Sequence, residues 1–408
     1  MNNDLKKLLQ RGYTPYQSCE EGAALLESSG FKRVTRSSLP SGKSKYFLIE
    51  DGCLTAVNAS TADSLMIVGS HTDSPALRLK SGLIGGERLN CEVYGGAINY
   101  TFFDTPLKIC GRVLVETRDG VRAKSVVSDY RVTVPSLAVH QNRGVNGGFA
   151  PTVQGDMTPL IGAHPDFIER LSDGEKVIGY DLYACPDVEP YESGLSGEYL
   201  CSPRIDNLTS VYASLKALTL AKPKGIAVCV CFNGEEVGSK VRRGAAASFF
   251  PSLLSDIYLR AGGKNFKDVL DCSLMLSADN AHAAHPSHPE KSDPVAKVVL
   301  GGGVVVKHHT NYATDGLTEA VAKKLFAAAN VPVQDFYSQS DLPCGSTIGL
   351  MAAAATDIRT CDIGIAQLAM HSACETCALS DIDAMTAACT AFFSSEVQFS
   401  DGGATIKK

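Results

Sequence analysis

Short apolar runs and helical patterns alternate along most of the chain. Runs rich in β-branched residues, such as 64–69 and 225–232, predict buried strands. Ala- and Leu-rich stretches at 207–220, 315–329 and 382–393 predict helices. Strands that alternate with helices are typical of α/β folds. We therefore predict an α/β/α sandwich, in which helices cover a central sheet.

The pattern changes between residues 84 and 174. Gly, Asp and Ser separate short β-type runs in this segment, and only residues 165–171 have a helical pattern. The runs lie at 92–94, 109–116, 123–129 and 131–134. We therefore predict two domains: an α/β domain formed by residues 1–83 and 175–408, and an inserted β-rich domain formed by residues 84–174.

Composition agrees with two domains and argues against some partners. The chain has 408 residues, 44% of them hydrophobic, which is enough for more than one core. A net charge of −6 and the lack of a dense Lys/Arg cluster argue against nucleic acid as a partner. No apolar run approaches the roughly 20 residues that span a bilayer, and residues 1–12 lack the apolar core of a signal peptide. We expect no membrane partner.

The 14 cysteines bear on the compartment. Many lie inside apolar runs, as Cys229 and Cys231 do, and a buried free thiol behaves as a small hydrophobic side chain. Free thiols fit a reducing compartment, so we predict a cytoplasmic protein. Cys374 and Cys377 form a single C-x-x-C, which we interpret as coincidence.

Five short polar clusters carry the candidate chemistry, and four of them directly follow an apolar run. In the first, His71 follows a predicted strand, and ligands bind beyond the carboxyl ends of strands in α/β sheets. Asp73 could accept the second N–H of a metal-bound imidazole, although an ordinary surface loop also explains H-x-D. In the second cluster, Asp206 precedes a predicted helix, where Asp is also a favoured helix cap.

The third cluster, Glu235-Glu236, is the most specific. Two adjacent carboxylates at a strand end are electrostatically costly without a cation, and one can bind metal while the other acts as a base on water. A solvated acidic loop is the alternative. Asp279 and His371 follow two further apolar runs. Together, the ordered set suits a pair of zinc-like ions that share one carboxylate.

These residues stand in motifs that resemble those of the aspartyl aminopeptidase family. The motifs are H-T-D-S-P at 71–75, S-P-R-I-D-N at 202–207, N-G-E-E-V-G-S at 233–239, S-A-D-N-A-H-A-A-H-P at 277–286 and M-H-S at 370–372. Further matches, among them L-A-V-H at 137–140 and Y-A-T-D at 312–315, follow the family's order. They extend the resemblance from residue 70 to residue 393.

The resemblance implies a zinc metalloaminopeptidase that removes the N-terminal residue of peptides and prefers Asp or Glu there. Two divalent ions are implied, most simply Zn²⁺, with Mn²⁺ or Co²⁺ as the alternatives in one site. A water activated by the two metals would attack the peptide bond, with Glu235 as general base and Asp73 supporting a ligand. The implied metal ligands, of which the second is shared, are His71, Asp206, Glu236, Asp279 and His371.

The resemblance also implies an assembly and a specificity residue. Family members form tetrahedral dodecamers built from dimers, and a histidine of the inserted domain reaches the partner's active site. His140 holds that position, although the residues alone suggest a structural histidine. Lys307 holds the position of a lysine in the pocket for the N-terminal side chain, where a cation would pair with a carboxylate. A solvated lysine is the alternative.

The sequence departs from the family pattern in three places. Cys374 stands where the family usually has Arg, and Gly234 stands where a larger residue is common. Both positions bear on the tuning of the site. The spacing from His71 to Asp206 is short for the family, which bears on assembly through the inserted domain.

Two other functions share parts of this pattern. A related two-metal carboxypeptidase or deacylase would use the same ligands at strand ends, and peptides blocked at one terminus would distinguish it from an aminopeptidase. A non-catalytic assembly protein would keep the fold without turnover. The intact Glu235 argues against this second alternative, because a scaffold needs no general base.

Overall fold

A nine-stranded mixed sheet forms the centre of the computed structural model, which describes residues 1–407. In order across the sheet, the strands are β1 (Lys32–Arg33), β2 (Ser44–Glu50), β3 (Cys53–Ala59), β12 (Ile226–Phe232), β4 (Leu65–His71), β13 (Ser273–Ala278), β17 (Thr360–Gly364), β15 (Val304–His308) and β16 (Val333–Tyr337). The neighbours β12, β4, β13 and β17 run parallel. Their carboxyl ends therefore meet at one edge of the sheet.

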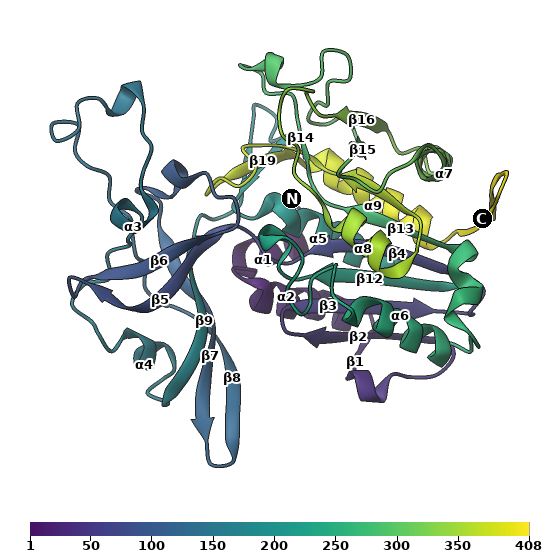
Figure 1. Ribbon diagram of the computed structural model, residues 1–408, viewed down its shortest axis with the longest axis horizontal. Coiled ribbons are helices and arrows are strands. Elements are labelled where there is room, and N and C mark those ends of the chain that lie inside the picture. Colours follow the sequence, from purple (N-terminus) through teal and green to yellow (C-terminus); the bar gives the residue numbers. More distant parts are fainter. Residues whose placement is uncertain (408) are drawn as a thin grey trace.

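Helices cover both faces of this sheet (Figure 1). One face packs against α1 (Asn3–Arg11), α2 (Pro15–Ser28), α5 (Ile205–Leu220), α7 (Gly316–Ala328) and α9 (Leu379–Phe393), and the other against α6 (Phe249–Arg260) and α8 (Ile348–Thr356). Successive side chains of β4 point to opposite faces of the sheet. Met66 and Val68 join the core on one face, whereas Leu65 and Ile67 join the core on the other, so the sheet is covered by helices on both faces. The predicted α/β/α sandwich is confirmed.

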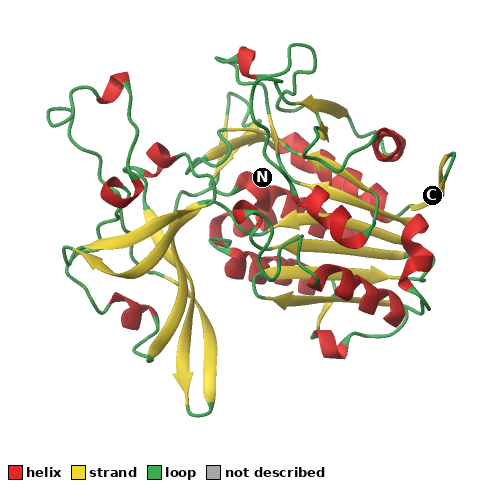
Figure 2. Ribbon diagram, viewed as in Figure 1, coloured by secondary structure: helices red, strands yellow, loops and turns green. Residues whose placement is uncertain are grey.

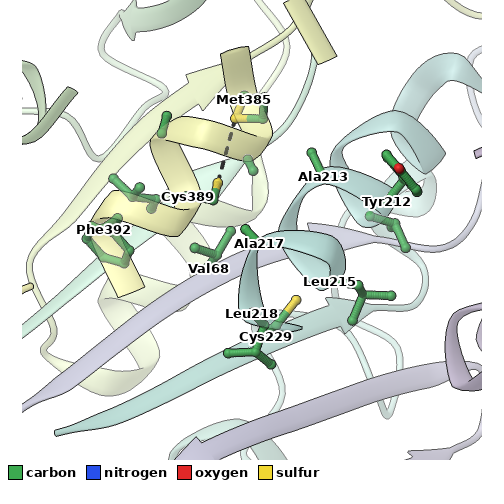
Figure 3. Packing of buried hydrophobic residues seen from close by; sticks show 14 of the residues in the cluster. Val68, Tyr212, Ala213, Leu215, Ala217, Leu218, Cys229, Met385, Cys389 and Phe392 are labelled. Atoms are coloured by element: carbon green, nitrogen blue, oxygen red, sulfur yellow. Dashed lines mark hydrogen bonds between the residues drawn. The ribbon is translucent and has the colours of Figure 1, made fainter. Parts of the chain in front are cut away.

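The larger core lies between the sheet, α5 and α9. Figure 3 shows Ala213 and Ala217 of α5 and Cys389 of α9 beside Val68 and Cys229 of the sheet. Small side chains on α5 let the helix approach the strands closely. All 14 cysteines are free thiols and eleven of them are buried, as predicted for thiols that pack as small hydrophobic groups.

A separate five-stranded sheet lies beside this domain, at the left of Figures 1 and 2. In order, its antiparallel strands are β6 (Arg88–Tyr94), β5 (Ala76–Ile84), β9 (Val177–Pro186), β7 (Leu107–Thr117) and β8 (Gly120–Val127). It has its own core, which includes Leu77, Ile109 and Leu182. Two short helices, α3 (Val153–Asp156) and α4 (Phe167–Leu171), accompany it.

The sheet extends beyond the expected range 84–174. Strand β5 begins before residue 84 and β9 lies wholly beyond residue 174, yet both belong to this sheet because they pair with β6 and β7. We therefore use the name β-rich unit for residues 76–186. The segment 131–134 forms isolated bridges through Val132, Thr133 and Val134 rather than a strand.

A third, smaller sheet carries parts of the candidate site. Its order is β10 (Tyr191–Ser193), β11 (Tyr199–Ser202), β19 (Glu375–Ala378), β18 (Ala366–Leu368) and β14 (Ala281–His282). A final hairpin pairs β20 (Glu396–Ser400) with β21 (Gly403–Lys407). Within residues 1–407, every helix is too short or too polar to cross a bilayer.

Candidate metal centre

Three neighbouring strands deliver four of the predicted residues to one edge of the central sheet. His71 is the last residue of β4, Glu235 and Glu236 begin the turn after β12, and Asp279 directly follows β13. Because these strands run parallel side by side, their carboxyl ends place the four side chains together. Residues that follow separate apolar runs in the sequence therefore lie side by side in the fold.

Asp206 lies at the start of α5 but does not cap the helix. Its backbone is non-helical (φ −82°, ψ 106°), and its peptide bond to Asn207 is cis. Its Oδ1 lies 3.4 Å from Nε2 of His71, and its Oδ2 lies 3.6 Å from Nε2 of His371. The helix-capping interpretation is thus wrong, because the carboxylate faces two histidines.

Two groups of candidate donor atoms share Asp206, and a further group at the same place joins His71, Glu235 and Glu236. We use the name donor groups for the two that share Asp206. In the first group, Nε2 of His71 also lies 3.4 Å from Oδ1 of Asp279. In the second, Nε2 of His371 lies 3.4 Å from Oε1 of Glu236. Two ligands that are each about 2.1 Å from one tetrahedral ion lie about 3.4 Å apart, so each group has the spacing of ligands around one cation.

Buried negative charge also favours cations at this place. Among residues 1–407, Oδ1 of Asp206 and Oε1 of Glu236 are buried and have no hydrogen-bond partner. Burial raises the pKa of Glu236 well above its ordinary value, although His371 opposes this. Burial likewise raises the pKa of Glu235 to about 8. Carboxylates crowded in this way stay ionised only when positive charge accompanies them.

The two adjacent glutamates point to different places. Glu236 faces His371, whereas Glu235 lines a cavity of about 290 Å³ beside the donors. Oε2 of Glu235 lies 4.0 Å from Nε2 of His71. We call this space the first cavity; Asp279, Lys307, Tyr312 and His371 also line it. A carboxylate on its wall can reach a water molecule or a substrate.

Asp73 supports the site in a different way from the one expected. Nδ1 of His71 lies 3.0 Å from the main-chain oxygen of Asp73 and 3.6 Å from its carboxylate. The carboxylate instead accepts hydrogen bonds from the backbone N–H groups of Glu235 and Glu236, at 3.1 Å each, and from the Tyr94 hydroxyl at 2.9 Å. Burial alone would raise the pKa of Asp73, but the neighbouring His71, with the hydrogen bonds from Tyr94 and the Glu236 N–H, holds it below its ordinary value.

Glu375 is a residue of the centre that the sequence analysis missed. It begins β19, is 1% exposed, and accepts hydrogen bonds from the backbone N–H groups of Asp206 (2.9 Å) and His371 (2.6 Å). His371 has a positive φ of 70°, so its backbone needs such support. The available signal was a charged residue at the start of an apolar strand, four positions after His371.

A Glu375→Gln variant is expected to weaken metal binding about 10- to 100-fold, because residues that hold metal ligands in place have effects of this size. An amide offers one acceptor where the carboxylate offers two, so one backbone N–H loses its partner. The measurement is metal affinity by competition with a chromophoric chelator.

The matched control is Asp381→Asn. The Asp381 carboxylate is buried and accepts from the backbone N–H groups of Gly301 and Gly303, both at 2.8 Å, but it belongs to neither donor group. Both variants are expected to lower the free energy of unfolding by about 1–3 kcal/mol, since each leaves a buried group unpaired. Only Glu375→Gln should change metal affinity. An equal effect of the two on affinity would contradict a specific role.

Lys307 lies beside the first donor group. It is 3% exposed, and its ammonium donates to the main-chain oxygen of Asn280 at 2.9 Å. Its Nζ also lies 3.6 Å from Oδ2 of Asp279 and 4.9 Å from the ring centre of Tyr312. Burial would lower the pKa of Lys307, but the Asp279 carboxylate raises it above its ordinary value. The interpretation as a solvated lysine is therefore wrong.

His140 is the one predicted site residue that the fold does not bring to the donor groups. It is exposed in a loop of the β-rich unit, next to Val139, which is 51% exposed, and near Leu137, which is 62% exposed. A role for this side chain in the centre therefore requires a second subunit.

An α/β sandwich with carboxylates and histidines gathered at its strand ends is the architecture of a metal-dependent hydrolase. The chain belongs to the M18 peptidase family: the family model described as aminopeptidase I zinc metalloprotease matches residues 8–176 and 166–393. It is therefore an M18 family aminopeptidase.

Curated relatives and solved structures agree with this assignment. The chain is 34% identical to a probable M18 family aminopeptidase 2 of Clostridium acetobutylicum, covering 93% of this chain and 97% of the relative. Its fold is similar to a chain in a complex of Ape4 and Nbr1 (TM-score 0.90, 29% identity, 96% and 85% covered). A yeast mApe1 chain, from a structure described as a dodecamer, has a TM-score of 0.82, 23% identity, and 96% and 95% covered.

Proposed function

We propose that this aminopeptidase works with two divalent cations of the zinc class, one in each donor group. The observation that carries the proposal is the shared Asp206, whose two oxygens face His71 and His371. Cations held there would supply Lewis-acid activation of water and of the scissile carbonyl.

Glu235 is the general base in this proposal. Its carboxylate would take a proton from the attacking water and return it to the leaving amine, which is why its place on the cavity wall matters. In this proposal Asp206, Glu236 and Asp279 are metal ligands, so Glu235 is the carboxylate of the cavity wall that remains to act as the base.

The test is turnover of a panel of aminoacyl amides, measured with and without a chelator. The expected result is release of the N-terminal residue that stops on chelation and returns with added Zn²⁺. Peptides with a blocked N-terminus should resist cleavage. Cleavage of these blocked peptides from the C-terminus would instead indicate a carboxypeptidase.

We also propose that Lys307 selects Asp or Glu as the N-terminal residue. It is a buried cation on the wall of the first cavity, so its ammonium can pair with an acidic side chain of the substrate, whereas an apolar side chain gains no such interaction. Charge-assisted hydrogen bonds contribute about 1.5–3 kcal/mol, which corresponds to a preference of roughly 10- to 100-fold.

A Lys307→Met variant is expected to lose this preference, with kcat/KM falling for Asp and Glu substrates and unchanged or higher for Leu. The ratio of acidic to Leu kcat/KM is the decisive measurement, because damage to Asp279 would lower both alike. Lys323→Met is the matched control, since Lys323 pairs with Glu319 and Asp335 away from the first cavity. A wild-type preference for Leu would refute the specificity proposal.

Two further proposals concern assembly and location. We propose a homo-oligomer, a dodecamer built from dimers, in which the β-rich unit forms the dimer contact and His140 enters the partner's centre. The exposed apolar side chains of Leu137 and Val139 beside His140 support a contact there. The fourteen free thiols support a cytoplasmic location.

A further inference from the structure

A second cavity, of about 300 Å³, adjoins the first. His282 and Phe336 line both cavities and form the wall between them. Ala369, on the second cavity, is two residues before His371 on the first. A ligand that fills the first cavity therefore has a neighbouring space into which it can continue.

The charged side chain that lines the second cavity is positive. Lys291 lines it, together with hydrogen-bonding side chains such as His285, Ser338 and Gln339, and no Asp or Glu among residues 1–407 does so. The carboxylate of the neighbouring Glu290 lies 3.4 Å from Nδ1 of His288, and within the described residues no carboxylate lies within ion-pair distance of the Lys291 ammonium. The cavity thus offers an unpaired ammonium to a ligand.

The chemistry of the first cavity determines which part of a peptide reaches the second. In the proposed function, the N-terminal side chain pairs with Lys307 and the scissile bond lies at the donor groups. The second cavity, across the His282–Phe336 wall, is then a neighbouring space for the following residue. Successive side chains of an extended peptide point to opposite sides, which two adjoining cavities can accept.

We propose that the second cavity binds the side chain of the substrate's second residue and favours an acidic one. The inference rests on the proposed aminopeptidase function and extends its substrate class to peptides with two acidic residues at the N-terminus. Lys291 is the specificity-determining residue, and its pairing with the substrate carboxylate is sensitive to salt because the lysine is exposed.

The experiment measures the turnover of the dipeptides Asp-Asp, Asp-Ala and Asp-Lys by three proteins: the wild type, Lys291→Glu and Lys297→Glu. The last is the control, because Lys297 is an exposed lysine of the same segment that lies outside the cavity. The wild type should prefer Asp-Asp over Asp-Lys by about fivefold in kcat/KM at low salt. Lys291→Glu should abolish or invert that ratio, and Lys297→Glu should leave it unchanged.

Equilibrium binding of the same dipeptides to metal-loaded Glu235→Gln protein separates this inference from the proposed function. If the wild type does not turn over these dipeptides, but Asp-Asp binds to Glu235→Gln more tightly than Asp-Lys does and Lys291→Glu removes that difference, the cavity assignment stands and the peptidase proposal fails. Equal binding and turnover of the three dipeptides would overturn the cavity assignment. A shift by Lys291→Glu in the preference for the first residue, measured with the panel of aminoacyl amides, would overturn it as well.

Discussion

A Glu235→Gln variant is expected to bind metal as the wild type does and to lose about 10²–10⁴-fold in turnover. The amide has nearly the same shape as the carboxylate, so the first cavity and the donor groups should keep their geometry. It cannot accept a proton from water, however, and the general-base step is lost. Metal content by mass spectrometry and kcat on an aminoacyl amide are the two measurements.

The neighbouring residue provides the matched control. Glu236→Gln makes the same chemical change one position along the chain, but it turns a candidate carboxylate ligand, 3.4 Å from Nε2 of His371, into a neutral amide that binds a cation more weakly. This variant should therefore lose metal together with turnover. If Glu235→Gln loses metal and Glu236→Gln retains it, the two roles are exchanged.

We propose that His140 stabilises the oxyanion that develops in the partner's centre. A His140→Ala variant is therefore expected to keep its metal content and its assembly and to lose about 10²–10³-fold in turnover, the cost of removing one such donor. The residue is exposed in the β-rich unit, so its removal should leave the fold intact. His164→Ala, another exposed histidine of the same unit, is the control and should have little effect.

Mixing His140→Ala with Glu235→Gln tests whether His140 acts on the partner subunit. In a symmetric mixed dimer, one centre combines an intact Glu235 with the partner's intact His140 and the other centre has neither. Random exchange should therefore restore activity in about a quarter of all centres. If mass spectrometry shows mixed dimers and no activity returns, His140 does not act across subunits.

The residues of the centre that could be predicted from the sequence are those that directly follow an apolar run. His71, Glu235 and Asp279 each follow a strong apolar run, and parallel neighbouring strands bring such positions together. Glu375 could not be found in this way. Its hydrogen bond to the Asp206 N–H spans 169 residues and depends on the pairing of β11 with β19.

The first and last residues of the β-rich unit could not be predicted from the sequence for a related reason. Strands β5 and β9 have the composition of any half-buried strand, and their sequences do not show which sheet they join. That choice is made by pairing with β6 and β7. The sequence also could not show that His71 contacts the main-chain oxygen of Asp73. An H-x-D pattern is compatible with a contact to the main-chain oxygen or to the carboxylate.

The order of the donors along the chain has a consequence for biosynthesis. The second donor group is complete only with His371, and Glu375, which holds it, lies four residues further on. A growing polypeptide therefore exposes His71 and Asp206 long before the ribosome has released the residues that finish the centre. The two donor groups can therefore both form only once residue 371 has left the ribosome, and a chain that stops earlier lacks one candidate ligand of the second group.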